Sequence, residues 1–326
     1  SQSFNGSIDN VSVKEYLGQE VVPNSGCGSW LLEPQSTNLI TYSEDFSQWS
    51  NISDVTLEGG FPSPDGGNNA YKVTKNGGNA HIAGYSGINT NNHKSIWART
   101  TNGTGQIMLM NSITSQQYSL TDKWQRFNIE HSGGNWFYGV DFRNASVTLT
   151  EVLIYGAQLE QKSFSTSYIP TSGATSTRLQ DIANNSGNAS LINSESGVLY
   201  FEGSALADDG TNRRVTISDG LGSNDVGFRF NNVSNQIQVV SYINSSVVVN
   251  QTYVLTDITV IKKYALKWAL NNYALWVNGV EVITDISAIS FPISTLNTLN
   301  FASGTNTSPF YGKNKALAVY KTALTD

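Results

Sequence analysis

The chain has 326 residues with a net charge of −6, and only 13% of its residues are charged. This acidic balance argues against a nucleic-acid partner, because nucleic acid is bound by a basic face. The sequence holds no run of eighteen apolar residues, so we predict no membrane-spanning helix and no membrane partner.

The opening of the chain is typical of a strand. Residues 4–13, FNGSIDNVSV, place a turn before apolar positions at Ile8, Val11 and Val13 that polar residues separate. Residues 21–35 follow with two prolines and predict a linker. The first residue is Ser rather than Met, so we expect a chain that was processed or cut from something longer.

Residues 36–172 are predicted to form a first β-sandwich. Helical periodicity is almost absent, and short period-two segments are bounded by Gly, Asn, Asp or Pro. The candidate strands of this part are 38–43, 70–75, 93–100, 106–112, 123–131, 135–143 and 147–159. A stretch rich in Ser, Thr, Asn and Gly at 173–195 then predicts a second linker.

Residues 196–326 repeat the same pattern and are predicted to form a second sandwich. The candidate strands here are 197–206, 213–219, 226–232, 236–242, 246–251, 264–270, 273–282, 298–303 and 315–321. In the clearest of them, Tyr273, Leu275 and Val277 alternate up to Asn278-Gly279, a dipeptide typical of a type I′ hairpin turn. The fold class is therefore predicted to be all-β, with two tandem antiparallel β-sandwiches.

The hairpin and the end of the chain carry a family resemblance. YALWVNGVEV at 273–282, followed by FYGKNKALAVYKTALTD at 310–326, resembles the closing half of laminin-G-like, concanavalin A-like lectin domains. The resemblance covers 196–326 and implies a fold more than a ligand. Residues 36–172 are similar to jelly-roll carbohydrate-binding modules, on the strength of NLITYSEDFSQWS, DKWQRFNIEH and VLIYGAQLEQKSFSTSYIPT.

Two of these segments also resemble parts of bacteriophage virion proteins. LLEPQSTNLITYSEDFSQW at 31–49 and VLIYGAQLEQKSFSTSYIPT at 152–171 are similar to segments of tail, fibre and other virion proteins of marine phages. The resemblance implies a virion or extracellular location and other virion proteins as partners.

The opening strand is similar to the last one. Aligning Phe4 with Phe310 places Gly6 on Gly312, and residues 1–20 resemble the end of a preceding lectin-like domain. Three interpretations stay open: a piece of a modular fibre, a strand that pairs into one of the two sandwiches, or a chance similarity of short strands.

Catalytic motifs are not found in the sequence, which predicts a protein that is not an enzyme. Glycosidases need two carboxylates across the scissile bond, and 196–326 lacks a Glu-x-Asp-x-x-Glu pattern. Glu281 and Asp285 lie on either side of a strand end. Their spacing of four residues predicts that both side chains point to the same side of the sheet, and we interpret them as solvent-facing charges. The three histidines show no metal or triad spacing.

Exposed rings beside polar groups would bind sugars, whose flat faces stack on aromatic side chains. Trp97 and Arg99 are out of phase with Ile96 and Ala98, so they share an open face if those two enter the core; a core position for Trp97 is the alternative. Trp276 is out of phase with its neighbours and is a candidate for the outer surface. The candidate carbohydrate-binding residues are Trp97, Arg99, Trp136, Tyr138 and Trp276.

Calcium is the one cofactor that we consider. Sandwich modules of the resembled kinds often hold a calcium ion near an edge, bound by six to eight oxygens. Glu44, Asp45 and Glu160 lie in the first and last strands of the jelly-roll interpretation and are the candidate ligands, with plain surface acids as the alternative.

Together these observations predict a non-enzymatic virion component, in several copies, that binds polysaccharide or cell-surface glycans. A homo-oligomer is expected because weak single sites gain strength through copy number. Two alternatives are a secreted marine bacterial polysaccharide degrader or its binding module, and a purely architectural virion protein.

Overall fold

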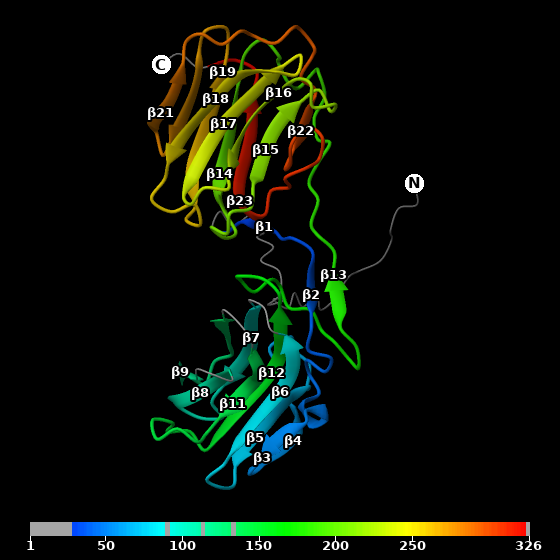
Figure 1. Cartoon of the computed structure of the whole chain (residues 1–326), viewed down its shortest axis with the longest axis vertical. Helices are drawn as coiled ribbons and strands as arrows, with labels where there is room; N and C mark the ends of the chain where they lie inside the picture. The colour runs from blue at the N-terminus through cyan, green and yellow to red at the C-terminus, as the bar shows by residue number, and fades with distance from the viewer. Residues whose placement is uncertain (1–27, 89–91, 112–114, 132–134, 324–326) are drawn as a thin grey trace, which may run out of the picture. The chain divides into compact units, whose positions relative to one another are not determined.

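The computed structural model describes residues 28–88, 92–111, 115–131 and 135–323 (Figure 1). The opening segment 4–13 lies outside these residues. The described chain forms two compact units, each with its own core. Unit 1 is Ser36–Arg178, and unit 2 is 179–323 together with 28–35.

Unit 1 contains two five-stranded antiparallel sheets. One has the order β10-β7-β12-β5-β4 and the other the order β3-β6-β11-β8-β9. Their strands are β3 Asn51–Ser53, β4 Val55–Phe61, β5 Ala70–Lys75, β6 His81–Ile88, β7 Asn92–Arg99, β8 Gly105–Asn111, β9 Ser115–Leu120, β10 Gln125–His131, β11 Asn135–Asp141 and β12 Glu151–Glu160. A short 3-10 helix, Phe46–Gln48, precedes them.

The core of unit 1 lies between these two sheets. Ile96 and Ala98 of β7 meet Ile82 and Ile107 of the opposite sheet, and all four are fully buried. Every second residue of a strand faces one side, so the alternating pattern of the sequence fills this interior. The arrangement is a β-sandwich.

A buried seam joins the first and last segments of unit 1. Asn38 ends β2 (Ser36–Asn38) and bonds four backbone groups, with Nδ2 donating to the carbonyls of Ala157 and Ile169 at 3.1 and 2.9 Å. Its Oδ1 accepts from the N–H groups of Ile40 and Leu159, each at 3.1 Å. Segments 31–49 and 152–171 therefore fold against each other.

Unit 2 contains a six-stranded and a five-stranded antiparallel sheet, ordered β1-β23-β14-β19-β20-β21 and β18-β17-β16-β15-β22. The strands are β1 Trp30–Leu32, β14 Gly197–Ala205, β15 Arg213–Ser218, β16 Asp225–Phe230, β17 Gln236–Ile243, β18 Ser246–Val254, β19 Lys262–Trp268, β20 Tyr273–Val277, β21 Val280–Asp285, β22 Thr298–Asn300 and β23 Gly312–Tyr320.

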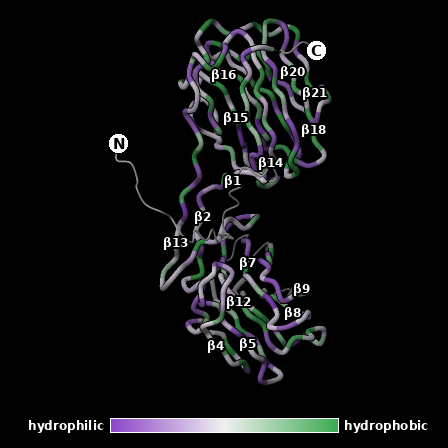
Figure 2. Tube along the Cα trace, turned by 180° about the vertical axis from the view of Figure 1, so that it is seen from behind, coloured by the Kyte–Doolittle hydropathy of each residue, from purple (hydrophilic) through white to green (hydrophobic). Residues whose placement is uncertain are grey.

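Aromatic side chains fill the space between these two sheets. Phe201 and Tyr264 of one sheet meet Phe228 and Phe230 of the other, and the Phe228 and Tyr264 rings stack at 5.6 Å. Hydrophobic and hydrophilic stretches follow one another along the strands (Figure 2). The faces of the two sheets that meet each other carry the core side chains.

The β20–β21 hairpin has the predicted turn. Asn278 and Gly279 both have positive φ, +52° and +83°, as a type I′ turn requires. The backbone N–H of Lys263 donates to Asn278 Oδ1 at 2.9 Å and fixes this end of β19 to the turn.

Two parts of the predicted linkers are strands. Trp30–Leu32 pairs with β23 at the edge of the six-stranded sheet, and Ser176–Arg178 forms β13, which pairs with β2. Short edge strands carry little periodic signal, so the sequence could not show them. The prediction of an all-β chain with paired antiparallel sheets is confirmed. Within the described residues, no helix has the length and apolarity needed to cross a membrane.

Candidate functional site

Two aromatic rings flank a small residue on the outer face of the six-stranded sheet. Leu199, Leu266 and Leu275 of three adjacent strands enter the core, so their neighbours in sequence point outward. Those neighbours are Tyr200, Ala265 and Trp276, which the register places in one row across β14, β19 and β20. We call the row of Tyr200, Ala265 and Trp276 the ring platform.

The ring platform is accessible from the solvent. Tyr200 and Trp276 are half-buried. The small methyl group of Ala265 lies between them and does not fill the gap between the two rings. Lys267 Nζ lies 4.9 Å from the centre of the Trp276 ring, yet the lysine is only 1% exposed. The buried ammonium group therefore packs against the indole ring, which keeps part of its surface exposed to the solvent.

Charged groups lie at the edge of the platform. Tyr200 donates through its hydroxyl to Glu202 Oε2 at 3.2 Å, and Lys315 Nζ lies 2.9 Å from Glu202 Oε1. The hydrogen bond from Lys315 holds the pKa of Glu202 below its usual range, although partial burial opposes it. Glu202 is thus an ionised acceptor at neutral pH, suited to binding hydroxyl groups.

The prediction for Trp276 agrees with its place on the outer face, while Tyr200 was missed. The signal for Tyr200 was present, because it is out of phase with Leu199 and Phe201 just as Trp276 is with Leu275 and Val277. What the sequence could not show is the register that brings the two rings into one row.

Trp97 lies on the predicted face of β7 but is not open to the solvent. It is 8% exposed and packs with Ala70, Tyr155 and Tyr168 against the outer face of the first sheet. The residues after β12 fold back and bring Tyr168 over it, and Gly156 with φ of +62° leaves the room for both rings. The prediction of an exposed Trp97 ring is wrong for this reason.

Arg99 lies beside Trp97 in sequence and is half-buried. Its guanidinium carbon is 5.2 Å from the centre of the Trp124 ring, a cation–π contact on the same sheet. The backbone of Trp136 and Tyr138 belongs to β11, but their side chains lie outside the described part of the structure.

The three candidate calcium ligands are held by different partners. Glu160 is fully buried and accepts from Ser36 Oγ at 2.5 Å and from the backbone N–H of Thr166 at 2.9 Å. Asp45 accepts from Ser47 and from the Tyr71 hydroxyl, which lies 2.8 Å away.

Glu44 instead belongs to a cluster around the Tyr155 hydroxyl, which lies 3.0 Å from both Glu44 Oε1 and Asp65 Oδ2. In the described part of the chain, no three His, Cys, Asp or Glu side chains gather in a way that could hold a metal ion. Glu44, Asp45 and Glu160 therefore do not form one ligand set. Whether the protein binds calcium stays a prediction.

Glu281 and Asp285 lie on opposite faces of β21. Glu281 pairs with Trp276 and Asp285 with Tyr273, but the register shifts between these pairs. The shift moves Asp285 to the side of the buried Tyr273, while Glu281 stays on the side of Trp276. The prediction that their spacing puts them on one side is wrong because of this bulge.

No family model matches the chain, and no curated protein matches it. Several solved structures are similar. One is the CBM40 module of the Ruminococcus gnavus IT-sialidase bound to α2,3-sialyllactose, with 17% identity over 45% of this chain and 90% of that one, and a TM-score of 0.35. Another is the LG4-5 domain pair of the mouse laminin α1 chain, with 12% identity over 74% of this chain and 86% of that one, and a TM-score of 0.31. A third is a prokaryotic β-1,3-1,4-glucanase (lichenase) from a mouse hindgut metagenome, with 15% identity over 49% and 74%, and a TM-score of 0.31.

Proposed function

We propose that this protein binds glycans through the ring platform of unit 2 and does not cleave them. The observation that carries the proposal is the row of Tyr200, Ala265 and Trp276, whose two rings are half-buried on the outer face of the sheet. A pyranose ring has a flat C–H face, and two aromatic rings on either side of a methyl group offer it a matching surface. Glu202 and Lys315 supply hydrogen-bond partners for the hydroxyl groups at the edge of the sugar.

The state of Glu202 supports binding without hydrolysis. A general acid in a glycosidase needs a raised pKa so that it holds a proton at neutral pH. Lys315 instead lowers the pKa of Glu202. The exposed Glu281 on the same face accepts from Thr284 and has no comparable burial.

The experiment is a calorimetric titration of the full chain with the neutral oligosaccharides that bind best on a glycan array. Trp276→Ala should weaken binding at least about tenfold, because it removes a stacking surface. Trp30→Ala is the matched control, since Trp30 is 58% exposed on β1 of the same unit and lies outside the platform. Equal affinity of both variants would reject the platform, and new reducing ends from the bound glycan would reject the non-enzymatic assignment.

We further propose that the protein works in a bacteriophage virion, as a tail or fibre component outside the cell. The support is the sequence resemblance of segments 31–49 and 152–171 to virion proteins. Several copies on one particle would turn weak single sites into firm attachment to a host surface. The genes that flank the coding sequence provide the test: tail or capsid genes are expected, and a cluster of polysaccharide-degrading enzymes would favour a secreted role.

A further inference from the structure

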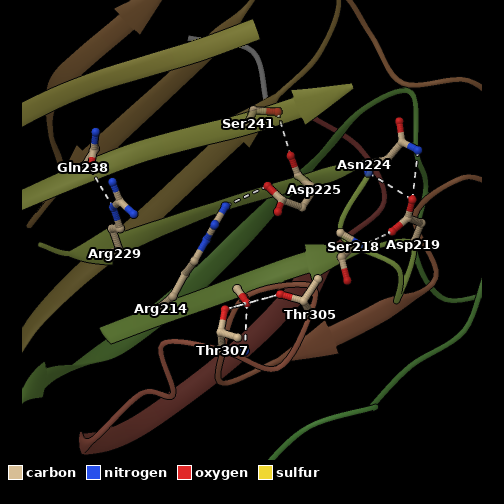
Figure 3. A network of polar contacts seen from close by, with 12 residues as sticks. Arg214, Ser218, Asp219, Asn224, Asp225, Arg229, Gln238, Ser241, Thr305 and Thr307 are labelled. Carbon is tan, nitrogen blue, oxygen red and sulfur yellow. Dashed lines mark hydrogen bonds and ion pairs between the residues drawn. The ribbon is translucent and has the colours of Figure 1, made fainter. Parts of the chain in front are cut away.

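The five-stranded sheet of unit 2 carries two arginines side by side on its outer face (Figure 3). Val215 of β15 and Phe228 of β16 enter the core, so alternation directs Arg214 and Arg229 to the opposite face. The two arginines are direct cross-strand partners in the register. Like charges in such positions repel each other and destabilise a sheet.

A single ion pair neutralises only one of these charges. Arg214 Nη2 lies 2.7 Å from Asp225 Oδ1, and both side chains are almost fully buried. Arg229 is half-buried, and its Nε donates to the neutral amide oxygen of Gln238 at 2.6 Å. Within the described residues Arg229 has no acidic ion-pair partner, so this end of the face keeps a positive charge.

Buried polar atoms without partners lie beside the arginines. Arg214 Nε, Thr216 Oγ1 and Asn300 Nδ2 are buried and have no hydrogen-bond partner in the described part of the chain. Thr216 and Asn300 are register partners on β15 and β22, and both are fully buried. The protein itself covers these three atoms, so a ligand at this face would meet the guanidinium ends of Arg214 and Arg229 rather than these atoms.

A flat ring lies next to these groups. Gly227 lies between the Arg229 and Asp225 positions of β16 and adds no side chain between Arg214 and Asp225. The Tyr242 ring on β17 is half-buried, and its centre lies 5.9 Å from the Arg214 guanidinium carbon.

We propose that Arg214 and Arg229 form a second binding site, separate from the ring platform, which binds the oxyanion of an acidic saccharide. The anion is a carboxylate of a sugar acid or a sulfate ester. Guanidinium groups bind both through paired hydrogen bonds, and a bound anion would relieve the repulsion between the two arginines. The Tyr242 ring would contact the sugar that carries the anion. The saccharide as carrier rests on the proposed glycan binding, whereas the anion is inferred from this site alone.

The test is a titration of the full chain with three trisaccharides of the same linkage: galacturonate, a sulfated galactose and neutral galactose. The two acidic ligands should bind, with an affinity that falls as salt is added. Arg229→Gln should weaken them at least about tenfold, since it removes a charged hydrogen-bond donor. The affinity of Arg229→Lys should lie between those of Arg229→Gln and the wild type, because lysine keeps the positive charge but loses the paired N–H donors of the guanidinium group. The stronger of the two acidic ligands identifies the anion.

Two controls separate this site from the platform. Lys321→Gln changes the same charge at an exposed position of unit 2 and should leave binding of the acidic ligands unchanged. Trp276→Ala should also leave it unchanged, while it removes neutral-glycan binding if the proposed function holds. Acidic-ligand binding that does not weaken as salt is added, or full acidic binding by a folded Arg229→Gln variant, would overturn this inference and leave the platform untouched.

Discussion

At the scale of single residues, burial decides what a side chain can do. Trp97 and Trp276 have the same alternation in the sequence, and each lies on the outer face of its sheet. The first is covered by Tyr168 and its neighbours, while the second is half-buried and keeps part of its ring exposed. Only a site with a free ring face can stack on a sugar, so unit 2 rather than unit 1 carries the proposed platform.

The burial of Asp225 has a measurable pH dependence. Burial raises the pKa of its carboxyl from 3.8 to about 6, and the ion pair with Arg214 only partly opposes this shift. Between these values the folded state binds a proton that the unfolded state has released. The free energy of unfolding therefore falls, as far as this group is concerned, as pH rises through the window.

From about pH 4 to about pH 7, we expect the unfolding free energy of the wild type to fall by up to about 3 kcal/mol relative to that of Asp225→Asn. Urea denaturation at both pH values measures it. A difference that is independent of pH, or that changes in the opposite direction, would show that Asp225 is ionised throughout.

At the scale of elements, a few buried side chains hold segments that are distant in sequence. Asn38 bonds four backbone groups of β12 and its neighbouring loops, as described above. Asn38→Ala removes the side-chain hydrogen bonds of all four buried backbone groups, so we expect the unfolding free energy to fall by about 3 kcal/mol or more. Chemical denaturation checks this value.

Asn76→Ala is the control, because the Asn76 side chain is exposed and bonds only Thr56 Oγ1 among the contacts that the structure gives. We expect a change within about 0.5 kcal/mol for this variant. Similar losses in both variants would mean that the seam is not what stabilises unit 1.

Long alternating strands were predictable, and short or glycine-rich ones were not. Segment 70–75 was predicted and is β5, whereas β6 (His81–Ile88) was not among the predicted strands. Its Gly84 fits because the Trp49 ring packs on it, with ring atoms 3.2 Å from where a Cβ would be. A tertiary contact of this kind leaves no periodic signal in the sequence.

The candidate site was predictable only in part, because it also depends on contacts between segments that are distant in the sequence. Alternation marks which residues leave the core, and Trp276 was found that way. The row of Tyr200, Ala265 and Trp276 depends on the pairing register of three strands, and the arginine pair depends on a fourth and a fifth. Register is set by contacts between segments far apart in the sequence, which one sequence does not reveal.

At the scale of the whole molecule, the two units have separate cores, and both proposed binding faces lie on unit 2. Its six-stranded sheet offers rings, and its five-stranded sheet offers positive charge. On a surface glycan with neutral and acidic sugars, the neutral sugars would contact the ring platform and the acidic sugars would contact the two arginines. If the protein is displayed in many copies on a virion, as we propose, such contacts would raise the effective concentration of binding sites without strengthening any single site.

The most direct test of the central claim observes Trp276 itself while a glycan binds. A chain labelled with 5-fluorotryptophan has seven fluorine signals, one for each tryptophan, and the signal absent from Trp276→Phe belongs to Trp276. On titration with the neutral oligosaccharide selected by the array, we predict that this signal shifts while that of the buried Trp268 does not. A saturating glycan that leaves the Trp276 signal unmoved would contradict the account.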